Sequence, residues 1–407
     1  MEYEVRHIAQ EELEAFRRCL GLAFGHDYDP EHLERGRKIF EFDRNMAAFD
    51  GGNIVGTCGI FSTEMAVPGG NLPVAAVTMV TVAPTHRRRG VASGLMRRQL
   101  EHVRERGESI AILWASESSI YGRFGYGVAI EMEVTHIPRV HSARRTDLAR
   151  PGGAVRLLSE NEARALLPDL HESIRRQFPG ELRRTPPWWD VRICSDPKEF
   201  RDGFTANHYL LYEGAAGPEG FARYRIKAAW DEWQPKGVVR VGDFFAATAD
   251  ATVALWDYLF GIDLIETIDM EVGGTPDPVI AMLADPRRAK RSRTDAIWLR
   301  IVDVEAALSG RLLGCEGRLV LEVEDAFLDG VGGTFELEGG PTGAVCRRTT
   351  ASADVRLDIE SLGTLFLGAG NLDQLARVGR VTGTAESLAR AQAMLGWWRA
   401  PHCQEHF

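Results

Sequence analysis

Apolar and polar positions change period several times along residues 1–150, which predicts a mixed α/β segment. Glu11–Leu20 has helical spacing, and Met46–Phe61 is predicted to form two strands that turn at Asp50-Gly51-Gly52. A second hairpin turns at Pro68-Gly69-Gly70. The turns are expected there because glycine supplies the positive φ angles that a tight hairpin requires.

A long β-rich run follows from Val74 to Val82 and stops at Pro84. A basic, glycine-containing loop then opens a helix that is expected from Val91 to Arg106, and Ser109–Ala115 is a short buried strand. This part of the chain therefore has the order strand, basic loop, helix, strand.

The same order recurs more faintly between Ala154 and Lys290. Strands are expected at His208–Tyr212, Gly220–Ile226 and Val238–Ala247, followed by a helix at Ala251–Phe260. The connection into this helix, ATADAT, contains neither glycine nor a basic residue. We interpret this segment as a degenerate second copy of the fold that has lost the means to hold a phosphate.

From Asp295 onward the pattern changes again. IWLRIV, RLVLEV and GTFELEG alternate as half-buried strands, and helices are expected at Glu360–Phe366 and Thr384–Trp398, which gives an α+β domain. The chain is therefore predicted to contain three domains, at residues 1–150, 151–293 and 294–407.

Composition narrows the class of protein. The chain is 44% hydrophobic and 26% charged, with no apolar run long enough to span a bilayer, so no membrane partner is expected. The N-terminus shows no signal-peptide pattern and the six cysteines form no CxxC pair, which favours the cytoplasm and argues against a metal site. A net charge of −10 disfavours nucleic acid and suits a cationic small molecule.

The stretch with the clearest chemistry runs from Val80 to Ser93. Its strand ends at Ala83-Pro84, and the basic loop RRRGVA places Gly90 and Ala92 where the next helix begins. Unpaired amide groups and the positive dipole end make such a helix start an anion site. A solvated arginine-rich helix start is the alternative, but the preceding strand and the spacing R-x-x-G-x-A favour binding. This pattern resembles the coenzyme A loop of the GNAT superfamily of N-acetyltransferases.

A second candidate element, SESSIYGRFGYG, follows the SIAILWA strand. In the superfamily that the loop resembles, a tyrosine shortly before a Gly-aromatic pair protonates the leaving thiolate, and Tyr121 before Gly125-Tyr126 matches that position. A phenol with pKa about 10 can protonate a thiolate whose thiol pKa is about 8.5. Tyr126 is expected to be a core aromatic.

Together, these motifs and the degenerate second copy make the chain similar to the enhanced intracellular survival (Eis) family of acetyltransferases. The resemblance implies tandem GNAT folds, the second degenerate, followed by a sterol-carrier-protein-like α+β domain. It also implies a homohexamer, acetyl-CoA as co-substrate, and multi-site acetylation of amines such as aminoglycosides, which would confer antibiotic resistance. In this family the terminal carboxylate serves as base, a role that falls on Phe407.

The resemblance also assigns binding residues. Contacts to acetyl-CoA would fall on Val80, Thr81, Val82, Arg87, Arg88, Arg89, Gly90, Val91, Ala92, Ser93, Ser116 and Glu117. Substrate contacts would fall on Phe24, Asp27, Tyr28, Met79 and His406. The chain departs here from some members of the family. His406 stands where those members have an acidic residue, Met79 where they have an aromatic one, and Arg37 lies in a region where they have tryptophan.

The sequence is equally compatible with a polyamine or a protein lysine as the acceptor. An alternative of a different class is a lipid-binding protein, which the last domain suggests. The intact RRRGVA loop and Tyr121 favour an enzyme over the lipid carrier.

Overall fold

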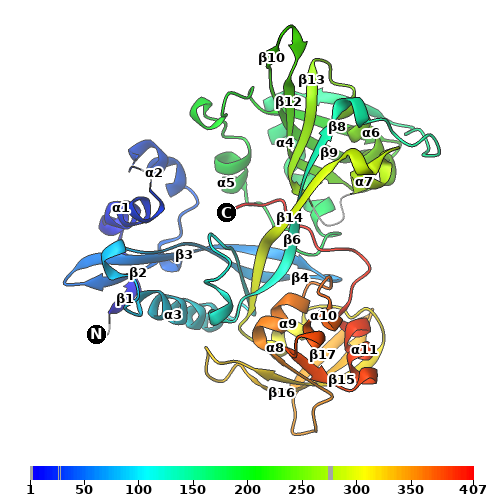
Figure 1. Cartoon of the computed structure of the whole chain (residues 1–407). Coiled ribbons are helices and arrows are strands. Elements are labelled where there is room, and N and C mark those ends of the chain that lie inside the picture. Colours follow the sequence, from blue (N-terminus) through cyan, green and yellow to red (C-terminus); the bar gives the residue numbers. More distant parts are fainter. Residues whose placement is uncertain (1–2, 26, 28, 274–277) are drawn as a thin grey trace. The chain divides into compact units, whose positions relative to one another are not determined.

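The computed structural model describes residues 3–25, 27, 29–273 and 278–407 (Figure 1). The chain forms two compact units. Unit 1 contains Met1–Ile130, Asp295–Arg399 and His406–Phe407, and unit 2 contains Glu131–Thr294 and Ala400–Glu405. Among the described residues, no helix is long and apolar enough to cross a membrane.

The N-terminal part of unit 1 is a sheet with helices on both faces. Its strands, in spatial order, are β1 (Glu4–His7), β2 (Met46–Asp50), β3 (Asn53–Val67), β4 (Gly70–Val82), β5 (Ile110–Trp114) and the end of β14 (Lys290–Ile301). Its helices are α1 (Leu13–Phe24), α2 (Pro30–Arg37) and α3 (Val91–Glu105). Strands β4 and β5 are parallel, and the other neighbours are antiparallel.

Alternation along β2 explains why helices cover both faces of this sheet. Met46 and Ala48 pack in the core that contains the start of α3, whereas Ala47 and Phe49 pack in the core that contains α1. Successive side chains of a strand point to opposite faces, so one short apolar run supplies two cores.

The C-terminal part of unit 1 is a 5-stranded sheet with its own helices. The strand order is β17 (Gly343–Arg348), β16 (Gly333–Gly340), β15 (Gly317–Glu324), β18 (Val355–Asp358) and β19 (Val381–Gly383). The helices are α8 (Val304–Ser309), α9 (Ile359–Leu365), α10 (Leu372–Arg377) and α11 (Ala385–Leu395). Helix α11 ends before Trp398, contrary to the sequence prediction, because Gly396 is extended at φ −64° and ψ 156°.

Unit 2 repeats the N-terminal architecture. Its sheet order is β7 (Ala154–Leu158), β8 (His208–Gly214), β9 (Gly217–Lys227), β12 (Gly237–Ala246), β13 (Ile265–Gly273) and β6 (Gly127–Pro138), and β10 (Trp230–Asp231) pairs with β11 (Gln234–Pro235). The helices are α4 (Glu160–Arg175), α5 (Pro186–Trp188), α6 (Ala249–Phe260) and α7 (Pro278–Met282). As in unit 1, one pair of neighbours, β12 and β13, is parallel and is joined through a helix.

The sheet of each copy includes one strand that lies outside that copy in the sequence. The antiparallel neighbour of β5 is β14, which follows the second copy in sequence, and that of β13 is β6, which follows the first. Helix α6 begins at Ala249, two residues earlier than the sequence predicts, because the Thr248 hydroxyl accepts a hydrogen bond from the amide of Ala251.

Candidate active site

The site begins where β4 and β5 separate. Their parallel pairing runs from Val74–Ile110 to Val77–Leu113, and beyond it β4 contains a bulge at Met79, whose φ is 53°. A positive φ is costly for a bulky side chain, and such strain is typical of functional sites. The bulge frees the following strand edge, Val80–Val82, to line a pocket.

Neighbouring residues hold this bulge in place. The Thr57 hydroxyl lies 2.7 Å from the Met79 carbonyl oxygen and 2.7 Å from the Thr81 hydroxyl. Gly59 leaves room for it, because a β carbon there would lie 2.2 Å from Asn45 Oδ1 and 2.6 Å from Met79 Cε. The strained strand is therefore fixed by its partner β3.

The loop before α3 has the geometry expected of an anion site. Arg88 and Gly90 adopt positive φ angles of 62° and 84°, and no side chain caps the first turn of α3. The amide groups at Val91–Ser93 are thus left for a ligand, and the helix dipole favours an anion there.

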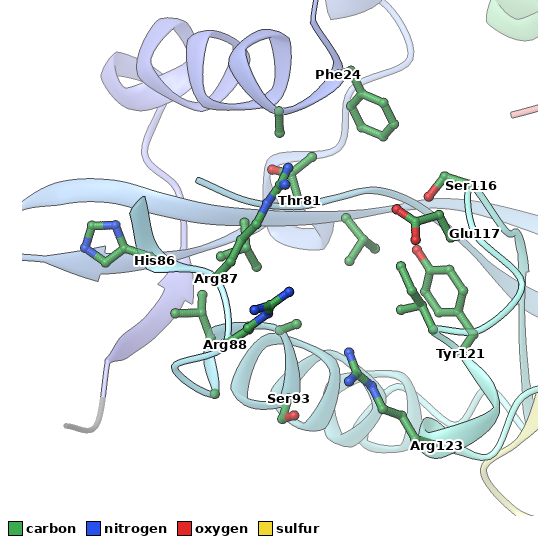
Figure 2. Close-up of a pocket in the computed structure, with 17 residues that line it drawn as sticks. Phe24, Thr81, His86, Arg87, Arg88, Ser93, Ser116, Glu117, Tyr121 and Arg123 are labelled. Carbon is green, nitrogen blue, oxygen red and sulfur yellow. The ribbon is translucent and has the colours of Figure 1, made fainter. Parts of the chain in front are cut away.

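A pocket of about 550 Å³ opens at this helix start (Figure 2). Its lining comprises Ala23, Phe24, Val80, Thr81, Val82, His86, Arg87, Arg88, Gly90, Val91, Ala92, Ser93, Ser116, Glu117, Ile120, Tyr121 and Arg123. All but one of the residues predicted to contact acetyl-CoA are therefore brought together, and Arg89 is exposed outside that lining. In Figure 2, Arg87 and Arg88 extend from the loop, with Tyr121 and Glu117 across the pocket.

Tyr121 lies in a turn that follows β5. It is buried, with 5% of its surface exposed, yet it lines the pocket. Burial raises the pKa of its phenol, against a hydrogen bond with Ser116 that lowers it. The turn continues through Gly125 at φ 82°, where a β carbon would lie 2.7 Å from Ile359 Cγ2, so a glycine is required there.

Tyr126 meets the expectation of a core aromatic. It has no exposed surface, its hydroxyl has no hydrogen-bond partner among the residues that the structure describes, and burial raises its pKa far above the ordinary value.

A smaller pocket of about 220 Å³ adjoins the first. Its lining comprises Phe24, Val77, Thr78, Met79, Val80, Trp114, Ala115, Ser116, Tyr121, His406 and Phe407. Phe24, Val80, Ser116 and Tyr121 line both pockets, so Tyr121 stands where the two meet.

The residues expected to contact substrate divide into two groups. Phe24, Met79 and His406 line the smaller pocket, and the His406 ring lies 4.9 Å from that of Trp114 between centroids. Asp27 is exposed and lines neither of these two pockets, and Tyr28 lies outside the described residues.

Some lining residues were not predicted from the sequence. Among them, Arg123 adds a positive charge and His86 an imidazole ring to the larger pocket, whereas Trp114 and Ile120 add apolar walls. Arg123 lies two residues after Tyr121 in the same turn, so the motif around Tyr121 contained the signal for it. Across the described ranges, no group of three or more His, Cys, Asp or Glu side chains is arranged to hold a metal ion.

Comparison with known proteins shows the same organisation. Residues 4–129 and 180–301 each match a family model described as an acetyltransferase (GNAT) domain, and residues 304–404 match a sterol carrier protein domain. The predicted α+β fold class, two GNAT folds and then a sterol-carrier-like domain, is thus confirmed. The predicted domain boundaries stay a prediction.

Relatives match over most of their length. The chain is 37% identical to an uncharacterized N-acetyltransferase of Streptomyces avermitilis over 388 residues, which cover 94% of this chain and 93% of that protein. It is 36% identical to N-acetyltransferase Eis of Mycobacterium bovis over 375 residues, 89% of this chain and 88% of that protein. The crystal structure of Eis1 from Mycobacterium abscessus superposes with a TM-score of 0.86 at 28% identity, covering 99% of this chain and 100% of that chain.

GNAT enzymes use acetyl-CoA, and in this chain two adjoining pockets meet at Tyr121. The chain belongs to the Eis family of N-acetyltransferases and transfers an acetyl group to amines.

Proposed function

We propose that acetyl-CoA occupies the larger pocket and that the acceptor is an aminoglycoside-type molecule with several primary amines, acetylated at more than one position. The observation that carries the proposal is the meeting of the two pockets at Tyr121. An acetyl group delivered from one pocket would there face an amine held in the other.

Acetyl-CoA fits the larger pocket through charge and backbone geometry. The amides of Arg88 to Ala92 and the start of α3 suit its pyrophosphate, and Arg87, Arg88 and Arg123 supply positive charge. The free edge of β4 at Val80–Val82 suits the amides of its pantetheine arm, because a strand edge offers unpaired N–H and C=O groups.

The reaction makes one bond and breaks one. The neutral amine nitrogen attacks the thioester carbonyl carbon, a C–N bond forms, and the C–S bond breaks. Tyr121 donates its phenolic proton to the leaving sulfur, and the α-carboxylate of Phe407, in the smaller pocket, accepts the proton from the amine. Exchange with water then restores both groups.

Charge and lining support a cationic acceptor. The protein carries a net charge of −10, and Glu117 and the Phe407 carboxylate place negative charge at the two pockets. Trp114 and Phe24 offer ring faces, which attract ammonium groups. The family resemblance adds the aminoglycoside class.

An acceptor screen tests this function. Purified protein is mixed with acetyl-CoA and with aminoglycosides, polyamines or lysine peptides in turn, and free CoA and product mass are measured. We expect CoA release with aminoglycosides and products that carry more than one acetyl group. Turnover with polyamines or peptides alone would reassign the acceptor, and lipid binding without any CoA release would contradict the proposal.

A further inference from the structure

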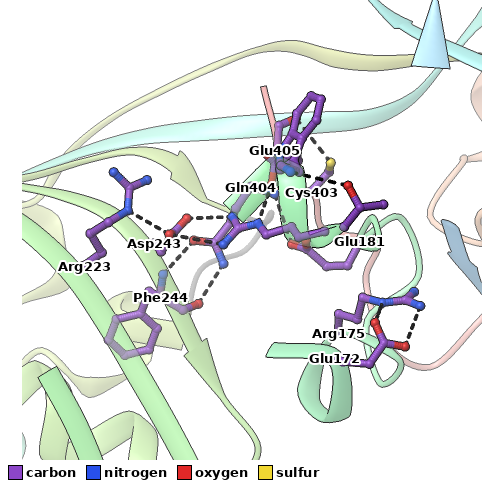
Figure 3. A network of polar contacts seen from close by, with 12 residues as sticks. Glu172, Arg175, Glu181, Arg223, Asp243, Phe244, Cys403, Gln404 and Glu405 are labelled. Carbon is purple, nitrogen blue, oxygen red and sulfur yellow. Dashed lines mark hydrogen bonds and ion pairs between the residues drawn. The ribbon is translucent and has the colours of Figure 1, made fainter. Parts of the chain in front are cut away.

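The segment after α11 is irregular, yet most of it is buried in unit 2. Ala400–Glu405 forms neither helix nor strand, yet Pro401, Cys403, Gln404 and Glu405 are all buried (Figure 3). Segments near chain ends are exposed unless something ties them down. Ala400–Glu405, here called the tail, is held by contacts from the rest of unit 2.

Gln404 pairs with the backbone of β12. The amide of Phe244 donates to Gln404 Oε1 at 2.7 Å, and Gln404 Nε2 donates to the Phe244 carbonyl oxygen at 2.7 Å. One side chain thereby satisfies both main-chain groups of a strand residue. A strand partner would otherwise have to do so, because buried backbone groups are costly to leave unpaired.

The contact between Gln404 and Phe244 lies just after the point where β12 stops pairing with β13. The parallel pairing of β12 with β13 ends at Val241–Met270, β12 has a bulge between Val241 and Asp243, and Phe244 follows. In the first copy β4 likewise ends its parallel pairing with β5, passes a bulge, and then lines the larger pocket with Val80–Val82. Gln404 therefore occupies, in unit 2, the strand edge that corresponds to the proposed acetyl-CoA groove of unit 1.

Glu405 is held by charge. Its carboxylate pairs with Arg184 and accepts a hydrogen bond from Trp188 Nε1 at 2.8 Å. Arg184 also donates to Asp243 at 2.9 Å, and both of these side chains are 1% exposed. Burial alone would raise the pKa of Asp243, but the guanidinium groups of Arg184 and Arg223 hold it well below its usual range.

The backbone of the tail is fixed as well. The amide of His402 donates to the Pro179 carbonyl oxygen at 2.8 Å, and that of Gln404 donates to Glu181 at 3.0 Å. The tail is thus bound through main chain, amide and carboxylate, as a peptide ligand is.

In unit 2, the helix start that corresponds to the proposed pyrophosphate site of unit 1 is capped by a neighbouring residue. Thr248 caps α6 by accepting from the Ala251 amide at 3.1 Å, whereas no side chain caps α3. Asp250 adds a negative charge in the first turn of α6. A helix start that is capped and acidic disfavours an anion.

We propose that the second acetyltransferase fold is a receptor for the chain's own tail, with Gln404 in the groove that corresponds to the acetyl-CoA site of the first fold. Gln404 and Glu405 are then positioning residues for His406 and Phe407, which line the smaller pocket. The docking itself is independent of the proposed function. Its catalytic consequence rests on the proposed role of the Phe407 carboxylate.

The thiol of Cys403 reports the docked state. It is 4% exposed and burial raises its pKa well above the ordinary value, so it reacts with an alkylating reagent only when the tail leaves its site. The experiment treats the full-length protein with iodoacetamide and follows each cysteine by peptide mass spectrometry. Cys194, buried in the same unit, is the internal standard for folding.

Two variants weaken the docking in different ways. Gln404→Ala removes the amide pair with Phe244 and retains every charge, whereas Glu405→Gln removes a charge-assisted pair. Each is expected to raise the alkylation rate of Cys403 about 10-fold or more, which corresponds to a loss of about 1.4 kcal/mol in the stability of the docked state. The matched control is Asp196→Asn, which disrupts ion pairs with Arg201 and Arg225 in the same unit and should leave Cys403 protected.

Steady-state kinetics test separately whether docking of the tail affects catalysis. In both tail variants kcat should fall while the KM for acetyl-CoA stays unchanged, and Glu405→Asp should restore part of the rate. If Cys403 stays protected in both variants, or Cys194 reacts in parallel with it even in Gln404→Ala, the receptor assignment is overturned. If Cys403 becomes reactive and kcat is unchanged, docking stands and the positioning role is overturned, whatever the acceptor proves to be.

Discussion

Tyr121 and Tyr126 lie with ring centroids 6.0 Å apart, but their hydroxyl groups meet different surroundings. Tyr121 lines both pockets, whereas Tyr126 has no exposed surface. An acid catalyst must reach the leaving group, so access, more than side-chain type, assigns the role to Tyr121.

The first prediction concerns that role. Tyr121→Phe should lower kcat about 10²- to 10⁴-fold, the usual contribution of one positioned acid, with little change in acetyl-CoA affinity. Tyr126→Phe is the matched control and should have little effect, because it deletes a hydroxyl that has no hydrogen-bond partner among the described residues. Equal losses in the two variants would mean that the wrong tyrosine has been chosen.

The pH dependence of the rate gives a second prediction at this position. The phenol acts in its protonated form, and burial raises the pKa of Tyr121 above its ordinary value of 10.0. The fall in kcat that depends on Tyr121 should therefore be centred above pH 10.0. A profile of kcat against pH for the native protein checks this, and a Tyr121-dependent fall centred below that value would contradict it.

The proton acceptor gives a third prediction. A glycine added after Phe407 moves the α-carboxylate without changing any other side chain, and it should remove most acetyl transfer. Acetyl-CoA binding and the protection of Cys403 should be retained. His406→Ala, by contrast, should alter acceptor preference more than rate. Native turnover in the extended protein would place the base elsewhere.

At the scale of elements, the loop before α3 carries the fourth prediction. Gly90→Val should weaken acetyl-CoA binding at least 10-fold, because the loop loses the φ of 84° that aims its amides and about 1.4 kcal/mol suffices for that factor. Gly107→Val is the control: Gly107 has φ 75°, open space around it, and lies at the other end of α3. Calorimetry that finds equal affinities in the two variants would remove the loop from the site.

Local signals in the sequence predicted the elements that carry this loop. Asp50-Gly51-Gly52 marked the turn between β2 and β3, and the end of β4 at Val82 and both ends of α3 were placed to within a residue. The start of β4 was misplaced, since the strand begins at Gly70 and not at Val74. The end of α11 was misplaced, because apolar spacing continues through Trp398 while Gly396 turns away from helical angles. The exchange of β6 and β14 was also missed, because strand order depends on contacts between segments distant in sequence.

At the scale of the molecule, the docking of the tail was beyond sequence reasoning. Gln404 contacts a residue 160 positions earlier and Glu405 one 221 positions earlier, and neither belongs to a motif. The pockets were more accessible to prediction, because most of their lining lies in the contiguous stretch from Val80 to Arg123. The homohexamer and the cytoplasmic location, which rest on resemblance and composition, stay predictions.

We propose that acetyl-CoA binds to the first acetyltransferase fold while the second holds the tail. Isothermal titration of the full-length protein with acetyl-CoA tests it most directly. We expect one site per chain, because α6 is capped by Thr248 and Gln404 occupies the edge of β12. That site should be lost or strongly weakened in Gly90→Val. Two sites per chain, or one site that Gly90→Val leaves unchanged, would show that the two folds do not divide these roles.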